Sequence, residues 1–264
     1  MTRTNPHPRV LIVVATLGRR PDYLPLTLRS IREQSVPADI VIVAPTGIPE
    51  VEEQAREFGA TLLPDPGSLT AAINLGVDEG LTDHDFVNWL NDDDLLESGS
   101  LAATTGLLDS HPEAVVAFGS CRYIDGAGRE LWVSKAGSWA PRVLLWGPDL
   151  IPQPGMLVRV EAWRQVGGLD ESYRLAFDLD LLLRLRKHGR LVETPKIVSS
   201  FRWHADSLTV DDRSTNIAES ERAKRAALSP TARRLAWIWE APVRVATRAA
   251  ANSVNRRAQK ATQA

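Results

Sequence analysis

An apolar strand that runs directly into three consecutive carboxylates is the feature of this 264-residue sequence that most restricts its fold. The apolar segment Phe86–Leu90 is followed without a spacer by Asn91-Asp92-Asp93-Asp94. A strand buried on both faces has such a composition, and open α/β sheets bind ligands just beyond the carboxyl ends of these strands. Three adjacent negative charges near a core are tolerated when a bound cation neutralises them. The junction predicts an α/β sheet with a cation site at its edge. A solvated turn, in which Asp94 or Ser98 caps the next helix, explains the same residues.

Strands and helices alternate along the first 80 residues. Runs rich in β-branched residues predict strands over 9–16, 39–44 and 61–63. Apolar residues at helical spacing predict helices from Asp22 to before Pro37, over 51–58, and over 69–79 with Ser68 as N-cap. This order predicts a doubly wound, mostly parallel sheet flanked by helices.

The loop after the first strand indicates how a nucleotide could bind. It has no Gly-x-Gly-x-x-Gly pattern and no Walker-type lysine, so dinucleotide dehydrogenases and P-loop enzymes are disfavoured. Arg19 and Arg20 could instead contact phosphates, or they could be inert surface residues. The small residues near Asn74 and Gly76 fit close packing or a bound nucleotide.

The composition, 44% hydrophobic and 24% charged, fits a globular protein with one sizeable core. The apolar stretch 10–18 is far shorter than the roughly 20 residues of a membrane span, and residues 1–9 lack the layout of a signal peptide. A single cysteine, Cys121, fits a reducing compartment. We therefore expect a cytoplasmic protein.

Several ordered motifs resemble those of the family 2 glycosyltransferases, which have the GT-A fold. The first is Gly67-Ser-Leu-Thr-Ala-Ala-Ile-Asn-x-Gly followed by Trp89-Leu-Asn-Asp-Asp-Asp, in which Asn91-Asp92-Asp93 takes the place of the Asp-x-Asp motif. A turn at 124–128, expected to form a hairpin, and the segments 152–158, 166–171 and 176–185 continue the resemblance, which covers roughly residues 9–210. Two departures are the absence of acids at Ala44-Pro45-Thr46, where many relatives read the nucleotide base, and Phe177, where an acid often stands.

This resemblance implies an inverting, metal-dependent hexosyl- or deoxyhexosyltransferase. A UDP-, dTDP- or GDP-sugar would donate to a hydroxyl of a saccharide or lipid-linked acceptor, in cell-surface polysaccharide or glycolipid synthesis. Asp178 is the implied catalytic base, and Asp93 and His204 are implied to hold Mg²⁺ or Mn²⁺. The implied donor-binding residues are Thr16, Leu17, Arg19, Arg20, Asn74, Asn91 and Asp92. The implied acceptor-binding residues are Gln153, Pro154, Gly155 and Phe177.

Plainer interpretations stay open for several of these residues. Asp178 also suits a helix N-cap, and Asp180 with Arg184 suits a structural helix pair. The tryptophans Trp132, Trp139 and Trp146 could form a sugar platform or fill a core. A sugar-phosphate nucleotidyltransferase shares the sheet and the acidic site, and a non-catalytic nucleotide- or carbohydrate-binding module is the alternative from a different class.

The C-terminal part carries a charge of opposite sign to the rest. From Arg222 onward ten basic residues accompany one acid, Glu240, giving about +9 against about −11 for residues 1–221. Apolar residues at helical spacing predict a basic amphipathic extension over 213–264, after a catalytic domain of residues 1–212; they are Leu235, Ile238, Trp239, Val245, Ala246 and Ala249. The extension could contact the inner face of the cytoplasmic membrane, or pack on the catalytic domain or on a second copy of the chain. The acidic body and the lack of a known module argue against nucleic acid as a partner.

Overall fold

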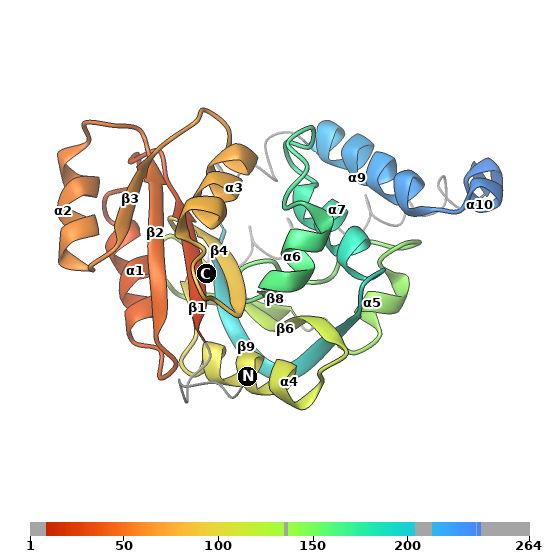
Figure 1. The fold of residues 1–264 in the computed structure, drawn as a ribbon, viewed down its shortest axis with the longest axis horizontal. Coiled ribbons are helices and arrows are strands. Elements are labelled where there is room, and N and C mark those ends of the chain that lie inside the picture. The colour runs from red at the N-terminus through yellow and green to blue at the C-terminus, as the bar shows by residue number, and fades with distance from the viewer. Residues whose placement is uncertain (1–8, 135–136, 204–212, 236, 239–264) are drawn as a thin grey trace.

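The computed structural model describes residues 9–134, 137–203, 213–235 and 237–238 (Figure 1). The strands are β1 (Val10–Ala15), β2 (Ala38–Ala44), β3 (Thr61–Pro64), β4 (Phe86–Asn91), β5 (Leu95–Leu96), β6 (Ala114–Ile124), β7 (Glu130–Ser134), β8 (Leu157–Arg159) and β9 (Arg190–Arg202). The helices are α1 (Leu24–Arg32), α2 (Pro49–Glu57), α3 (Leu69–Gly80), α4 (Ser100–Ser110), α5 (Ala140–Val143), α6 (Val160–Val166), α7 (Phe177–Leu185), α9 (Arg213–Ala227) and α10 (Pro230–Leu235).

The described strands form one sheet with the order β3-β2-β1-β4-β8-β6-β9-β5, and β7 pairs with β6. The first four strands of this order are parallel to one another, as the alternation of strands and helices predicts. Strand β8 is antiparallel to both of its neighbours and joins this half to the parallel pair of β6 and β9. The predicted doubly wound α/β fold is confirmed.

Strand β1 shows why its sequence is apolar at successive positions. Val10, Ile12 and Val14 pack into a core shared with α1, α2 and α4, whereas Leu11 and Val13 pack into a second core shared with α3, α6 and α7. Successive side chains of a strand point to opposite faces, so a strand covered by helices on both faces needs apolar residues throughout. The two cores place the ends of β1, β2 and β4 between helical layers.

Close packing of α3 on the sheet depends on Gly76. A Cβ atom at this position would lie 2.5 Å from Cγ1 of Val13, so any side chain there would push the helix from β1. Ser68 caps the helix as predicted, because its Oγ accepts a hydrogen bond from the backbone N–H of Ala71 at 3.2 Å. The small residues of this segment therefore serve packing.

Two local expectations had different outcomes. The predicted hairpin between β6 and β7 is confirmed, and its turn is closed by a hydrogen bond from the Gly128 N–H to the Asp125 carbonyl at 3.0 Å. The alternative that Asp94 or Ser98 caps the next helix is wrong. The N-cap of α4 is Gly99, which has a positive φ of 73° and can adopt this conformation because it lacks a Cβ atom.

The first helix of the C-terminal extension, α9, packs against α7 (Figure 1). Ala223 of α9 belongs to the core cluster that also contains α7 residues, so this helix shares the packing of the body. Within the described part of the chain, no helix combines the length and apolar character needed to cross a membrane. His204 and the predicted amphipathic positions from Trp239 onward lie outside the described residues.

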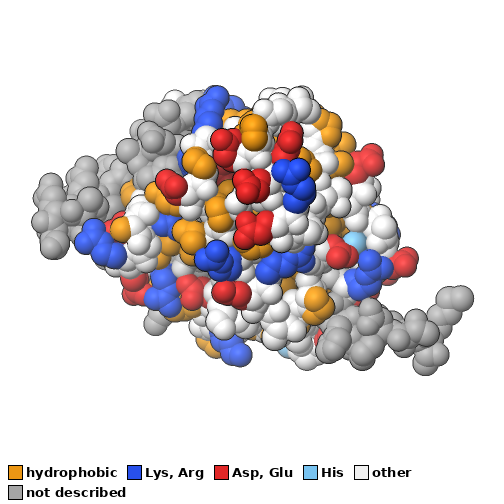
Figure 2. Space-filling view, turned by 90° about the vertical axis from the view of Figure 1, so that its left-hand side faces the viewer, with side chains coloured by type: hydrophobic (Ala, Val, Ile, Leu, Met, Phe, Trp, Pro, Cys, Tyr) orange, Lys and Arg blue, Asp and Glu red, His pale blue; other side chains and the backbone are white. Residues whose placement is uncertain are grey.

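The face that α2 occupies is mixed in charge. Acidic side chains lie beside basic ones there, and apolar side chains occur in small groups (Figure 2). Glu50, Glu52, Glu53 and Glu57 of α2 are exposed, as is Arg56. The buried side of the same helix is apolar and contributes Val51 and Ala55 to the core. Helix α2 is thus an outer cover of the sheet.

Candidate active site

A cavity of about 1290 Å³ opens where three parallel strands end. Ala15 ends β1, Val43 lies next to the end of β2, and Asn91 ends β4, and all three residues line the cavity. Ligands of open α/β sheets bind at the carboxyl ends of the strands because the chain leaves the sheet there and the loops diverge. The acidic triplet therefore lies at the edge of the sheet that the sequence predicts for a ligand site.

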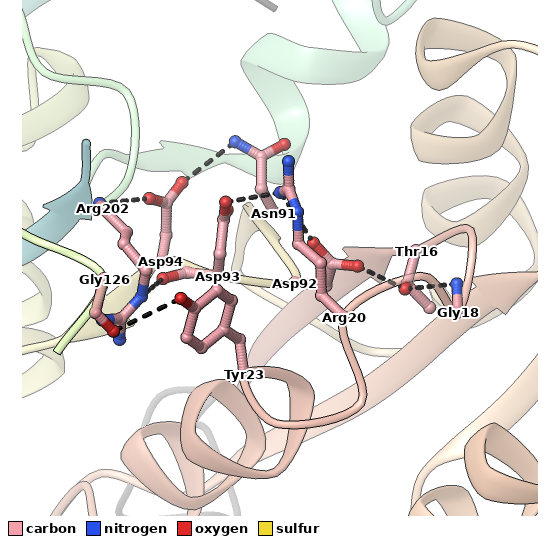
Figure 3. A network of polar contacts seen from close by, with 10 residues as sticks. All are labelled: Thr16, Gly18, Arg20, Tyr23, Asn91, Asp92, Asp93, Asp94, Gly126 and Arg202. Atoms are coloured by element: carbon pink, nitrogen blue, oxygen red, sulfur yellow. Dashed lines mark hydrogen bonds and ion pairs between the residues drawn. The ribbon is translucent and has the colours of Figure 1, made fainter. Parts of the chain in front are cut away.

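Two of the three consecutive carboxylates face this cavity. Asp92 accepts a hydrogen bond from Thr16 Oγ1 at 2.5 Å, and Thr16 Oγ1 in turn accepts one from the N–H of Gly18. Arg20 donates through Nη1 to Asp92 Oδ1 at 3.3 Å and to Asp93 Oδ2 at 2.5 Å (Figure 3). The pKa of Asp92 lies above its ordinary value, and burial is the largest cause. The hydrogen bond from Thr16 opposes this rise, the charge of Asp93 adds to it, and the contact with Arg20 opposes it. Arg20 thus supplies the cation that holds the pair together.

The third carboxylate, Asp94, is fully buried and serves the fold. Its two oxygens accept from Asn91 Nδ2 at 2.9 Å and from the backbone N–H of Arg202 at 3.3 Å. Burial, followed by the charge of Asp93, holds the pKa of Asp94 well above its usual range. The Arg202 guanidinium donates to the backbone carbonyl of Asp93 at 3.2 Å and lies 4.3 Å from the Tyr23 ring centre. Asp94 and Arg202 therefore brace the loop that presents the other two carboxylates.

The same cavity is lined by Asp178, an acidic residue from the second half of the chain. Asp178 is the second residue of α7, and its Oδ1 accepts from the N–H of Leu179 at 2.8 Å. The N-cap position is occupied by Ala176, so the alternative interpretation of Asp178 as an N-cap is wrong. Burial raises the pKa of Asp178 to about 6, against the lowering effect of the backbone hydrogen bonds. A carboxylate with this pKa is ionised at neutral pH and is a stronger base than an ordinary aspartate.

The sequence reasoning did not single out Asp149, which lines the same cavity. Asp149 accepts from the N–H of Ile151 at 3.0 Å. Burial and then the charge of Asp178 raise the pKa of Asp149 to about 7. The available signal was an acid three residues after Trp146, but nothing in the local spacing links this position to Asp178. Asp149 therefore joins Asp178 among the carboxyl groups that line the cavity.

Comparison with known proteins identifies the fold. No protein-family model matches this sequence, and no curated protein matches it. Solved structures do match. S. aureus TarS 1-349 in complex with UDP-GlcNAc has a TM-score of 0.60 at 16% identity over 85% of this chain and 69% of that chain. The mannosyltransferase PcManGT from Pyrobaculum calidifontis, in complex with GDP-Man and Mn²⁺, has a TM-score of 0.60 at 16% identity over 94% of this chain and 76% of that chain.

This chain has the GT-A fold. A longer S. aureus TarS chain matches with a TM-score of 0.61, and 42% of its length is covered. At identities of 14–16% these likenesses establish the architecture.

The residues present suit the divalent ion that the GT-A fold implies. Asp92 and Asp93 offer hard oxygen ligands at the cavity, where a guanidinium already compensates their charge. No group of three or more His, Cys, Asp or Glu side chains is arranged for a metal among the described residues. One or two carboxylates completed by substrate phosphates is a usual Mg²⁺ arrangement, so two carboxylates are sufficient. The predicted contribution of His204 lies outside the described residues.

Most of the other predicted residues line the cavity of this GT-A fold. Leu17, Arg19, Asn91, Pro154 and Phe177 lie in its wall, together with Gln153. Gln153 Nε2 donates to the backbone carbonyl of Trp89 at 2.8 Å, which ties the predicted acceptor loop to β4. The structure therefore brings predicted donor and acceptor residues, which are far apart in sequence, to one cavity.

Two predicted residues do not line the cavity. Asn74 donates to the Leu169 carbonyl and accepts from the Leu169 N–H, both at 2.9 Å, so its amide bridges α3 to the loop before α7. A Cβ atom at Gly155 would lie 2.6 Å from Val198 Cγ2, so this glycine allows close packing. The predicted pair of Asp180 and Arg184 is confirmed as a structural ion pair at 2.7 Å.

Aromatic and C-terminal residues complete the wall. Trp146 lines the cavity and is 42% exposed, as a platform requires. Trp132 instead stacks on Tyr123 with ring centres 4.4 Å apart, and Trp139 is exposed. Several cavity residues were not expected from the sequence: Asp65 after β3, Tyr123 of β6, and the α9 residues Asn216, Ser220, Glu221 and Lys224. The α9 residues show that part of the extension contributes to the site.

Proposed function

We propose that this protein is an inverting, metal-dependent glycosyltransferase of the family 2 type. The observation that carries this proposal is that one cavity contains Asp92 and Asp93 beside Arg20, and also contains Asp178 with its raised pKa. The first group suits a nucleotide diphosphate with its ion, and the second suits a hydroxyl that must lose a proton. The complexes of TarS with UDP-GlcNAc and of PcManGT with GDP-Man and Mn²⁺ support this class of donor.

The chemical step assigns Asp178 the role of general base. The acceptor oxygen attacks the anomeric carbon while the bond from that carbon to the diphosphate oxygen breaks, and the diphosphate keeps the electron pair. Asp178 takes the proton of the acceptor hydroxyl. Attack on the face opposite the leaving group inverts the anomeric configuration. Proton transfer to a well-placed base of this kind contributes on the order of 10²- to 10⁴-fold to the rate.

The donor half supplies charge compensation. When bound, Mg²⁺ or Mn²⁺ would be held by Asp93, with Asp92, and would stabilise the negative charge on the leaving diphosphate. Arg19 and Arg20 contribute positive charge in the same wall, and Thr16 fixes the orientation of Asp92. The chain has no acid at Ala44-Pro45-Thr46, and Asp65, directly after β3, lines the cavity. We assign Asp65 the role of reading the nucleotide base.

The deciding experiment is a screen of UDP-, dTDP- and GDP-sugars with Mn²⁺, beginning with UDP-GlcNAc and GDP-Man. Release of nucleoside diphosphate, with a product of inverted anomeric configuration by NMR, is the expected result. A sugar-phosphate nucleotidyltransferase would instead form a nucleotide-sugar and pyrophosphate from a sugar phosphate and a nucleoside triphosphate. A non-catalytic binding module would bind the donor without any turnover.

The proposal extends to the acceptor and to the place in the cell where the protein acts. We propose that the acceptor is a saccharide or a lipid-linked saccharide of cell-surface polysaccharide or glycolipid synthesis, and that the basic extension makes peripheral contact with the inner face of the cytoplasmic membrane. Leu235, Trp237 and Ile238 are 48%, 70% and 54% exposed next to Arg233 and Arg234. Exposed apolar residues beside arginines suit an anionic lipid surface.

A further inference from the structure

Glu219 of helix α9 makes several hydrogen bonds to the segment that leads into α7. Its Oε2 accepts from the backbone N–H groups of Arg174, Leu175 and Ala176 at 3.1, 2.8 and 3.0 Å, and its Oε1 also accepts from Arg174 at 3.0 Å. Ala176 is the N-cap of α7, and Asp178 follows two residues later. The carboxylate of Glu219 therefore fixes three consecutive peptide groups immediately before the proposed base.

These N–H groups need a partner from outside α7. The first intrahelical hydrogen bond of α7 runs from the N–H of Asp180 to the Ala176 carbonyl, so the groups at 174–176 precede the helical ladder. At neutral pH an ionised carboxylate is the strongest side-chain hydrogen-bond acceptor available to these N–H groups. Its negative charge is also favourable next to the N-terminus of a helix. Although burial raises the pKa of Glu219, the hydrogen bonds from Arg174, Ala176 and Leu175 lower it below its ordinary value.

Two further contacts hold α9 in the same place. Arg222 donates to the Ser172 carbonyl at 2.7 Å, and its guanidinium lies 3.8 Å from the centre of the Tyr173 ring. Lys224 donates to the Gly147 carbonyl at 2.5 Å, two residues before Asp149. Glu219, Arg222 and Lys224 thus connect one helix to the segment that leads into α7 and to the loop that carries Asp149.

We propose that Glu219 is a positioning residue for Asp178, and that α9 is a working part of the catalytic site. This inference rests on the proposed function, because it assigns Asp178 the role of base. The side chain of Glu219 does not act on the substrate. It sets where α7 begins, and hence where the Asp178 carboxylate meets the acceptor hydroxyl. A displacement of about 1 Å at such a group can reduce turnover by on the order of 10²-fold.

The first test measures the contact itself in the full-length protein. Glu219→Gln keeps the size of the side chain but replaces one acceptor oxygen by an NH₂ group, which faces the Arg174 N–H in either orientation of the amide. The substitution also removes the charge that strengthens the hydrogen bonds from Leu175 and Ala176. We expect hydrogen exchange of the amides at 174–176 to become at least about 10-fold faster than in the wild type. Glu161→Gln is the matched control, because Glu161 is an exposed glutamate in the first turn of α6 and does not line the cavity. Unchanged protection at 174–176 in Glu219→Gln would overturn the proposal.

The second test separates positioning from general stability. With the active donor, we expect kcat of Glu219→Gln to fall on the order of 10- to 100-fold while the Kd of the nucleotide diphosphate with Mn²⁺ stays within about 2-fold. Glu219→Asp retains the charge and should recover part of kcat. The proposal would be overturned if Glu219→Gln kept the wild-type kcat although its amides at 174–176 exchanged faster. Equal losses of kcat and of nucleotide binding in Glu219→Gln and Glu219→Asp would also overturn it. A wild type inactive with every donor would overturn the proposed function, and the exchange measurement would still decide whether Glu219 holds the segment.

Discussion

Arg20 donates to the Asp93 carboxylate at 2.5 Å, in the position where the proposed function places a divalent ion. The same Nη1 atom lies 3.3 Å from Asp92, so one guanidinium compensates both carboxylates of the cavity wall. A metal ion that binds Oδ2 of Asp93 must displace this contact. The released guanidinium would then be free to contact the diphosphate of the donor.

The first prediction concerns Arg20→Gln. We expect Mn²⁺ alone to bind this variant more tightly than the wild type, because the ion no longer competes with the guanidinium. We expect the nucleoside diphosphate with Mn²⁺ to bind at least about 10-fold more weakly, because a charged hydrogen bond worth about 1.5–3 kcal/mol is lost. Calorimetry measures both affinities. Arg19→Gln removes the same charge from the same loop and should leave Mn²⁺ affinity unchanged; an equal rise in both variants would show that Arg20 has no specific role.

The second prediction is that nucleotide binding depends on the ion. Without a divalent ion, Asp92 and Asp93 repel the diphosphate, so binding should become undetectable by calorimetry after EDTA treatment and return with Mn²⁺ or Mg²⁺. Asp93→Ala should abolish the metal response. Equal affinity with and without EDTA, or wild-type activity in Asp93→Ala, would refute the assignment of Asp93 as a metal ligand.

The third prediction concerns the base. Asp178→Asn is almost isosteric and should lower kcat on the order of 10²- to 10⁴-fold while donor affinity stays near the wild-type value. Steady-state kinetics and calorimetry on the same preparation provide the two numbers. If a folded Asp178→Asn protein retained its turnover, Asp149 would be the next candidate, because Asp180 is paired with Arg184.

The fourth prediction follows from the pKa of Asp149, which burial and then Asp178 raise to about 7 from an ordinary value of 3.8. Between these values the folded protein binds more protons than the unfolded chain, so its stability falls as pH rises from about 4 to 7. Asp149 lines the cavity and is partly exposed, so we expect a loss on the order of 1–3 kcal/mol.

Chemical denaturation at pH 5 and pH 8 tests this sign. Asp149→Asn cannot ionise, so its stability relative to the wild type should be higher at pH 8 than at pH 5. The exposed Asp83→Asn serves as the control variant. Parallel pH dependences in the wild type and in Asp149→Asn would contradict the raised pKa of this carboxyl group.

The fifth prediction concerns the extension. Full-length protein should sediment with liposomes that contain anionic lipid at low salt, and the attraction should weaken as salt increases. The triple variant Leu235→Ser, Trp237→Ser, Ile238→Ser should bind these liposomes more weakly. Its turnover with a soluble acceptor should be unchanged, since the three residues are exposed and do not line the cavity. A truncation after Ser229 is the second test, because it retains the whole of α9 and removes the residues that follow. Equal binding by the truncated protein would refute a membrane role for the tail.

The strand and helix pattern could be predicted from the sequence because it depends on short-range properties. The apolar run of β1, the Ser68 cap and the turn after Ile124 are each specified by neighbouring residues, and each appears as predicted. The acidic junction after Leu90 could also be placed at a ligand edge, because the carboxyl ends of parallel strands share one side of the sheet.

Long-range contacts were decided only by the tertiary structure. The three adjacent aspartates look alike in sequence, yet Arg20 contacts Asp92 and Asp93 while the Arg202 backbone contacts Asp94. Their different environments, and hence the raised pKa of Asp94, depend on residues more than 70 positions away.

The contacts around Asp178 were also decided only by the tertiary structure. The resemblance of the 176–185 segment indicated Asp178, but it could not show that Asp149 approaches it or that Glu219 accepts from the peptide groups at 174–176. Charge composition suggested a separate basic tail, whereas α9 packs on α7. Local sequence determines which residues form an element and which face is apolar. Only the packing of elements in three dimensions determines which charges meet, because a buried hydrogen bond or ion pair forms between groups that folding brings together from distant parts of the chain.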